Sequence, residues 1–217
     1  MASIINASTT STSGLVYSAD ASGVLQLQSN GTTGLTVDTA ANVSTANLSI
    51  TGTLTVAGNV IAKSFSTAQA TTSGTSKDFT GIPSWAKRIT FMFYNCQTNG
   101  TSSPIVQLGT SGGVVTSGYI SSGAATNGGA GSAAQYTNGF GMGGGVATGS
   151  IWSGIMTITN ISSNTWVYSL SGSYNDAAYA MLGGGYVTLS GPLTSIRYTT
   201  VGGTSTFTAG NTNIMYE

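Results

Sequence analysis

The sequence predicts an all-β protein, in which an extended amino-terminal β arm or shaft precedes a jelly-roll-like β-sandwich. Three observations lead to this prediction. Apolar residues make up 40% of the chain and are mostly Val, Ile, Ala, Tyr and Phe scattered among Thr and Ser, which is a composition typical of strands. No window has the spacing of an amphipathic helix of useful length. Many short alternating segments are separated by Gly, Asn and Pro turn signals.

The composition changes near Phe65, which indicates a division into two parts. Before this residue the only aromatic side chain is Tyr17, whereas all three Trp, all six Phe and nine of the ten Tyr lie at or beyond it. Aromatic side chains supply much of the burial in a core, so a compact domain of ordinary size is expected over residues 66–217. Residues 1–65 are expected to form an extended arm or shaft.

The first elements expected in the arm are two short strands, at residues 24–28 and 35–38. Asn30 and Gly31 lie between them, and an Asn-Gly pair is a strong signal for a tight hairpin turn. The arm is therefore expected to contain a small β-hairpin.

A six-residue repeat follows in "LSITGTLTVAGNVIAKS", residues 48–64. Leu48, Leu54 and Val60 fall in one column of the repeat, and Ile50 and Val56 fall in a second. Alternation with period two predicts strands, but strands with such small side chains and no neighbouring strands cannot bury their own apolar residues. These five residues are therefore the predicted packing contacts between chains, and three identical arms wound together, a homotrimer, would cover them. The alternative is a disordered tail rich in Ser and Thr.

The carboxy-terminal part is expected to contain many short strands. Turn signals separate these strands, and many short strands separated in this way are typical of a two-sheet sandwich or jelly roll. In "KRITFMFYNC", Ile89, Phe91 and Phe93 share one face and are predicted to point inward. The segment between Tyr119 and Gly149 is predicted to be irregular, because it is rich in Gly and long for a connection. Strands are expected at residues 87–96, 105–109, 114–120, 151–159, 165–171, 186–189, 194–200, 205–208 and 213–217.

Charge excludes several classes of function. Charged residues make up only 5% of the chain, with five bases against five acids and no His. So few bases argue against binding to nucleic acid and to an anionic membrane surface. No apolar run approaches the roughly 18 residues of a membrane helix, and the amino-terminal residues do not read as a secretory signal. A single Cys excludes an internal disulfide, so folding in a reducing cytoplasm is expected, with much of the uncharged surface buried in an assembly.

No catalytic, cofactor-binding or metal-binding residue is predicted, and no cofactor. Without His there is no imidazole base and no Ser-His triad. A glycosidase would need two carboxylates across a cleft, and Asp78 and Asp176 are the only such pair left in the compact domain; isolated Asp residues in turns are usually structural. Cys96 has no base to activate it and alternates with Met92 and Tyr94, so a small semi-buried packing residue is predicted.

Two short motifs have both a functional and a structural interpretation. "GFGMGG", residues 139–144, matches the dinucleotide fingerprint G-x-G-x-x-G, but no helix pattern follows it and the interpretation is rejected. In "PSWAKR", Trp85 beside two bases could stack on a sugar or a nucleobase. The favoured interpretation is a strand entry in which Trp85 caps the sandwich while Lys87 and Arg88 stay in solvent.

The segment "SGTSKDFTGIPSWAKRITFMFYNCQTNGTSSPIVQLG", residues 73–109, resembles a recurrent carboxy-terminal domain of tailed-bacteriophage virion proteins, and the ending "TVGGTSTFTAGNTNIMYE" is similar to the same type. The arm is similar to shaft or attachment segments of phage fibres and head decorations. The resemblance implies a homotrimer located on the virion, fixed to the particle by its amino-terminal part and displaying a carboxy-terminal knob. It brings no catalytic residues.

Three functions are compatible with these features. The first is a capsid cement or head-decoration protein, with the chain itself and the major capsid protein or another virion protein as partners. The alternative is a short tail fibre or tail appendage that binds a host surface glycan through the carboxy-terminal domain. The third, a polysaccharide-cleaving spike, is the least favoured because the chain is poor in acids. The first is preferred, because extended arms suit a protein that lies across neighbouring capsid subunits.

Overall fold

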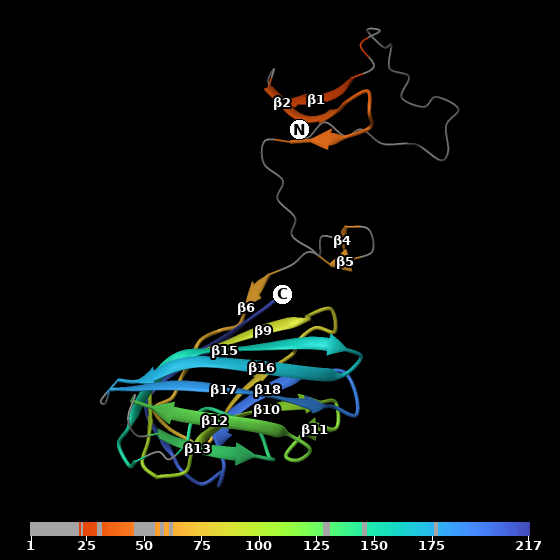
Figure 1. Cartoon of the computed structure of the whole chain (residues 1–217). Helices are drawn as coiled ribbons and strands as arrows, with labels where there is room; N and C mark the ends of the chain where they lie inside the picture. Colours follow the sequence, from red (N-terminus) through yellow and green to blue (C-terminus); the bar gives the residue numbers. More distant parts are fainter. Residues whose placement is uncertain are drawn as a thin grey trace. The chain divides into compact units, whose positions relative to one another are not determined.

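The computed structural model confirms an all-β fold (Figure 1). No helix occurs in the residues that it describes, which are 22, 24–29, 32–45, 55–56, 59–60, 63–127, 131–144, 147–175 and 178–217. None of this part of the chain therefore forms a helix that could cross a membrane. The chain divides into two compact units between residues 53 and 54.

The first unit contains the predicted hairpin. β1 (Leu25–Ser29) pairs antiparallel with β2 (Thr32–Val37), which in turn pairs with β3 (Val43–Ser44). The second strand ends one residue earlier than predicted because Asp38 forms the turn: its Oδ1 accepts hydrogen bonds from the amides of Ala40 and Asn42, at 2.9 and 2.8 Å. Hydrogen bonds from the side chain and backbone of Asn42 lower the pKa of this carboxyl.

The six-residue repeat is described only in small part. β4 (Thr55–Val56) pairs antiparallel with β5 (Asn59–Val60). Leu48, Ile50 and Leu54 lie outside the described residues, and only the backbone of Val56 and Val60 is described. The packing of these five side chains between copies of the chain stays a prediction.

The second unit is built around a large antiparallel sheet, whose strands β9, β15, β16, β17, β12 and β13 follow one another across Figure 1. The full order is β13-β12-β17-β16-β15-β9-β19-β6, and β7 also pairs with β19. The strands are β6 (Ser64–Phe65), β7 (Gln69–Ala70), β9 (Arg88–Thr98), β12 (Ile120–Thr126), β13 (Gly131–Tyr136), β15 (Ile151–Ser162), β16 (Thr165–Tyr174), β17 (Tyr179–Thr188) and β19 (Phe207–Tyr216).

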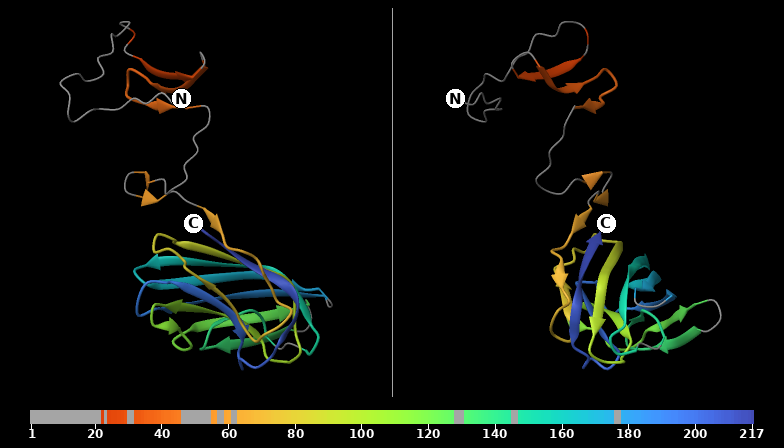
Figure 2. Two further views of the ribbon diagram at one scale, coloured as in Figure 1. Left: turned by 180° about the vertical axis from the view of Figure 1, so that it is seen from behind. Right: turned by 90° about the vertical axis from the view of Figure 1, so that its left-hand side faces the viewer.

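A smaller antiparallel sheet packs against the large one, as the two views of Figure 2 show. Its order is β11-β10-β18-β8, and β14 pairs with β10. The strands are β8 (Lys77–Thr80), β10 (Pro104–Thr110), β11 (Gly113–Val114), β14 (Phe140–Gly141) and β18 (Ser195–Thr200).

The core lies between the two sheets. Ile89, Phe91 and Phe93 are buried, which confirms the predicted inward face of β9. The ring of Phe91 lies 5.1 Å from that of Tyr198 on the small sheet. Trp152 of the large sheet is fully buried and donates a hydrogen bond from Nε1 to the hydroxyl of Tyr198. Aromatic side chains therefore join the two sheets, as expected for a core of this composition.

The expectation of an irregular segment between Tyr119 and Gly149 is wrong, because β12, β13 and β14 all fall within it. The alternation was hidden because the inward residues are small. A Cβ on Gly123 would lie 2.7 Å from the amide nitrogen of Gly143, and one on Gly141 would overlap the ring of Tyr136. These glycines are therefore required by the close approach of neighbouring strands and side chains.

Other strand boundaries also differ from expectation. The expected strand 114–120 is divided into the end of β11 and the start of β12, and β8 was not predicted. The separate strands expected at 205–208 and 213–217 are one strand, β19, whose pairing with β9 shifts register on each side of Ala209. Gly210 has a φ of 96° beside this irregularity and forms a bulge within β19.

Candidate functional site

A polar hollow of about 230 Å³ lies on the small sheet. It is lined by Thr75 and Ser76 before β8, Gln107 of β10, Thr116 after β11, and Arg197 with residues 199–203 at the end of β18. Thr and Ser side chains dominate this lining, and none of its residues in the described part of the chain is aromatic. We call this feature the polar hollow.

Strand register brings the charged residues of the site together. Arg197 of β18 is paired with Asp78 of β8 on one side and with Gln107 of β10 on the other. Side chains at paired positions point to the same face of a sheet, so these three form one row across it.

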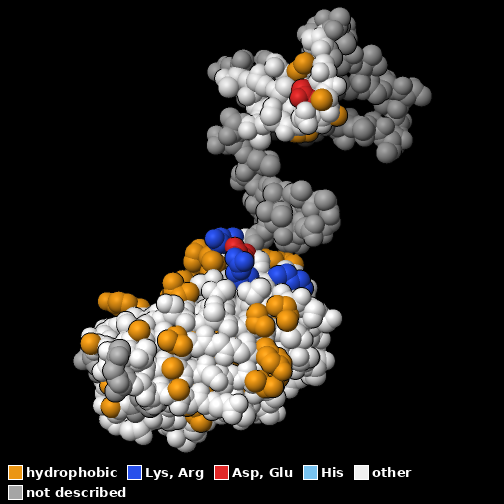
Figure 3. All heavy atoms as spheres, viewed as in Figure 1, with side chains coloured by type: hydrophobic (Ala, Val, Ile, Leu, Met, Phe, Trp, Pro, Cys, Tyr) orange, Lys and Arg blue, Asp and Glu red, His pale blue; other side chains and the backbone are white. Residues whose placement is uncertain are grey.

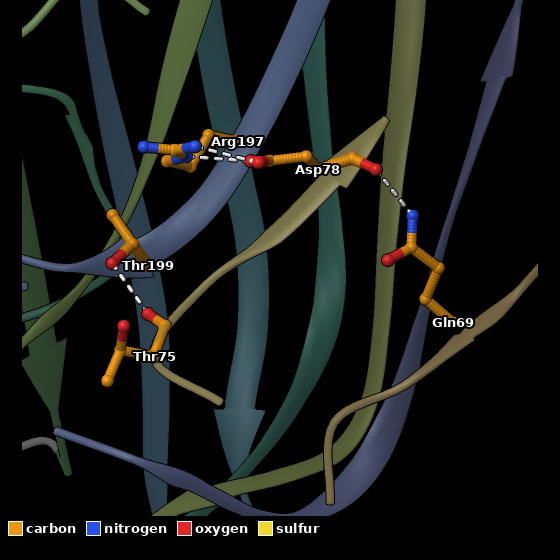
Figure 4. Close-up of polar contacts among 5 residues, drawn as sticks. All are labelled: Gln69, Thr75, Asp78, Arg197 and Thr199. Atoms are coloured by element: carbon orange, nitrogen blue, oxygen red, sulfur yellow. Dashed lines mark hydrogen bonds and ion pairs between the residues drawn. The ribbon is translucent and has the colours of Figure 1, made fainter. Parts of the chain in front are cut away.

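The Arg197 side chain forms a two-pronged ion pair with Asp78 (Figure 4). Nε donates to Oδ1 and Nη2 donates to Oδ2, each at 2.7 Å. This geometry fixes the plane of the guanidinium group. The hydrogen bonds to Asp78 raise the pKa of Arg197. A guanidinium group is charged in proteins in any case, and here its partner neutralises it. Both side chains are partly exposed, at 37% and 39%, so solvent screens the pair and its contribution to stability is small.

Two further hydrogen bonds position β8 and the residues before it, which lie next to the ion pair. Thr199 Oγ1 donates to the carbonyl oxygen of Thr75 at 2.8 Å, and Gln69 Nε2 donates to the carbonyl oxygen of Asp78 at 2.7 Å (Figure 4). Gln69 belongs to β7, which pairs with the large sheet. The large sheet thus holds β8 itself through Gln69, and the small sheet holds the segment leading into it through Thr199.

Gln107 and the turn after β18 complete the hollow. Gln107 is only 6% exposed, and its Nε2 donates to the carbonyl oxygen of Asn138 at 2.8 Å. Asn138 Nδ2 in turn donates to the carbonyl oxygen of Val201 at 3.1 Å. The turn closes with a hydrogen bond from the amide of Gly203 to the carbonyl oxygen of Thr200, at 2.9 Å. Gly203 has a φ of 67°, a conformation that Gly adopts without strain.

The chemistry available in the polar hollow is hydrogen bonding. It offers hydroxyl groups, one side-chain amide and one guanidinium group, whereas the backbone amides of Gly202 and Gly203 already donate to Ser102 Oγ and to the carbonyl oxygen of Thr200. Asp78 is held by Arg197, so its carboxylate oxygens are already occupied by two donors. Among the described residues no group of three or more His, Cys, Asp or Glu gathers as a metal site would require.

The residues that the sequence analysis weighed for chemistry have structural roles where the structure describes them. Asp78 lies in the ion pair, and its candidate partner Asp176 is outside the described residues. "GFGMGG" contains β14, with Phe140 and Met142 fully buried. Trp85 packs on the core and on Tyr216, with ring centres 5.6 Å apart, which confirms the favoured packing interpretation.

The charged ends of β6, β9 and β19 form a cluster at one end of the second unit (Figure 3). Arg88 donates to Glu217 at 3.0 Å, and Lys63 lies 3.8 Å from the same carboxylate. Lys87 and Arg88 are exposed, as predicted. The cluster is a solvated ion-pair network.

Cys96 is fully buried, so it is a packing residue as predicted, but it does not share the face of Met92 and Tyr94. Asn95, with a φ of 55°, and a register shift between β9 and β15 place Cys96 on the inward face, which is why its burial exceeds expectation. Burial raises the pKa of its thiol, and Sγ lies 3.4 Å from Thr71 Oγ1. The nucleophilic thiolate is therefore scarce at neutral pH. We expect a thiol reagent such as dithiobis(nitrobenzoate) to leave the native protein unmodified and to label one thiol per chain in denaturant. Immediate stoichiometric labelling of the native protein would contradict this packing.

The part of the large sheet's outer side formed by β12, β17, β16 and β15 is a second surface of interest, and it ends at β9, where Arg88 is paired with Thr159. Alternate residues of β12 (120–126), β15 (153–159), β16 (165–173) and β17 (180–188) point to it, and none of them is charged. Four large apolar side chains on it are about half exposed: Ile120, Ile155, Leu182 and Tyr186. We call this surface the charge-free face (Figure 3).

Sequence reasoning missed the polar hollow. The expected strand 194–200 already placed Arg197 and Thr199 on one face through its alternation. The missing information was the pairing of that strand with β8 and β10, which are distant in sequence. No protein-family model matches the chain, and no curated protein or solved structure is significantly similar to it.

Proposed function

We propose that the chain is a non-enzymatic structural protein of a tailed-bacteriophage virion: a homotrimeric capsid cement or head-decoration protein. Residues 1–65 would anchor it to the particle, and residues 66–217 would form the exposed knob. The chain itself and the major capsid protein, or another virion protein, would be its partners.

The charge-free face is the observation that carries this proposal. Exposed surfaces of soluble domains are ordinarily rich in Lys, Arg, Glu and Asp, whereas the centres of protein interfaces are depleted of charge. Four strands without charge, bearing half-exposed Ile, Leu and Tyr among Ser and Thr, fit a surface that other subunits cover. The resemblance of residues 73–109 and 200–217 to phage virion proteins supports the same assignment.

A second candidate function is that of a short tail fibre or tail appendage that binds a host surface glycan. The polar hollow favours this candidate, because hydroxyl, amide and guanidinium groups converge there without a competing catalytic arrangement.

Virion stoichiometry distinguishes the two candidates. Quantitative gel densitometry of purified virions is expected to give a copy number comparable with that of the major capsid protein. A copy number close to that of a tail component would contradict the head-decoration proposal and favour the second candidate. Release of new reducing ends from host polysaccharide incubated with the protein would contradict a non-enzymatic role.

Deleting residues 1–65 is expected to abolish incorporation into virions while leaving a folded carboxy-terminal part. The physical reason is that the repeat side chains, which need neighbours to cover them, are lost with the arm. Western blots of purified virions measure incorporation, and circular dichroism checks the fold. The full-length protein should sediment as a trimer; a stable monomer in dilute solution, or incorporation of the truncated protein, would contradict the proposal.

A further inference from the structure

We propose that the polar hollow is a binding site for one residue of a neutral saccharide. This inference names the site and ligand class of the glycan-binding candidate and therefore rests on it.

Size and shape fit a single sugar ring. The hollow has a volume of about 230 Å³ and is open to solvent. Pockets for drug-sized ligands are larger, roughly 300–1,000 Å³. A ring at the end or side of a longer glycan could enter while the rest of the glycan stays in solvent.

Unused hydrogen-bonding groups line the hollow. The hydroxyls of Ser76 and Thr116 make no hydrogen bond within the described part of the chain, and Nη1 of Arg197 donates none there. Oε1 of Gln107 accepts none from the described residues, although this side chain is almost fully buried. The site thus presents donors and acceptors together, and sugar hydroxyls act as both.

The charge balance favours a neutral ligand. Among the described residues that line the hollow only Arg197 is charged, and Asp78 already neutralises it through two short hydrogen bonds. A phosphate or carboxylate would bring a further negative charge next to Asp78. A neutral hydroxyl can accept from Nη1 without disturbing the pair.

Weak affinity is expected, because none of the described residues that line the hollow is aromatic. Without a ring for the sugar to stack on, binding depends on hydrogen bonds that replace those to water, each with a modest net contribution. A dissociation constant in about the millimolar range is expected for one ring. Useful affinity on a particle would then require several copies acting together.

Backbone-amide NMR of the isotope-labelled full-length protein tests the proposal. The probes are D-glucose, D-galactose, N-acetyl-D-glucosamine and L-rhamnose, with inorganic phosphate as the anionic comparison. At least one sugar is expected to cause saturable shifts centred on Ser76, Gln107 and Gly202, and phosphate to cause none. No saturable shift with any of these sugars, shifts centred elsewhere, or stronger shifts with phosphate would overturn the proposal.

A paired substitution gives the matched control. The double variant Ser76→Ala, Thr116→Val removes the two unused hydroxyls and is expected to weaken sugar binding by at least about tenfold. The double variant Ser150→Ala, Thr148→Val makes the same changes between β14 and β15, at residues that belong neither to the lining of the polar hollow nor to the charge-free face, and is expected to leave binding unchanged. Equal weakening by both would overturn the site assignment. The virion copy number is measured separately and does not depend on sugar binding. A wrong binding site can therefore be distinguished from a wrong structural role.

Discussion

Replacing Trp152 by alanine is expected to lower the free energy of unfolding by about 4 kcal/mol, the range found for large-to-small changes of buried aromatic residues. Trp152 is fully buried in β15 of the large sheet, and its Nε1 donates to Tyr198 in β18 of the small sheet. The substitution therefore opens a cavity between the two sheets and also removes a hydrogen bond that joins them.

Urea denaturation followed by circular dichroism measures this loss at a fixed protein concentration. Tyr198→Phe separates the hydrogen bond from the cavity, because it keeps the ring and leaves the buried N–H of Trp152 without an acceptor. This change is expected to cost about 1–3 kcal/mol. A Trp152→Ala variant as stable as the native protein would mean that the sheets do not depend on this contact.

The parts of the fold that could be predicted are those in which large side chains mark the buried face. In β9, Ile89, Phe91 and Phe93 alternate with partly exposed Thr90 and Met92, and the alternation is visible in the sequence because the inward residues are bulky. The hairpin of β1 and β2 was also predictable, since its Asn-Gly signal is local.

The parts that could not be predicted depend on contacts between distant residues. In β12 the inward positions are Ser121, Gly123 and Ala125, so burial leaves no apolar pattern in the sequence. They are small because β14 and the Tyr168 side chain lie against them: Tyr168 Oη lies 2.9 Å from Ser121 Oγ and donates to the carbonyl oxygen of Gly141 at 3.0 Å. The need for small residues is set by these partners, not by the strand itself.

The polar hollow was hidden for a similar reason. Asp78 and Arg197 are separated by 119 positions in the sequence, and each alone looks like an ordinary surface charge. Only the order β10-β18-β8 places both beside Gln107. The composition of the chain thus predicted an uncharged surface rich in hydroxyl groups. It could not predict where on that surface a site lies.

The glycine-rich segment supplies the second large effect: Gly141→Ala is expected to destabilise the protein by about 3 kcal/mol. A methyl group on Gly141 would overlap the ring of Tyr136, including Cδ2 and Cε2. The ring cannot move aside easily, because Tyr136 is buried and its hydroxyl donates to the carbonyl oxygen of Gly143. Overpacking of this kind forces a shift of β13 or of β14 against β10.

Gly191→Ala is the matched control, since a methyl group there has no neighbour within 4 Å and its backbone is outside the left-handed region. Its effect is expected to stay within about 0.5 kcal/mol. Thermal unfolding of both variants, followed by circular dichroism, measures the difference. If the two substitutions had equal effects, Gly141 would be a flexible loop residue after all, and the assignment of close packing between Tyr136 and β14 would be wrong. A large effect at Gly141 alone would show that the glycines of this segment are selected for contact distance rather than for flexibility.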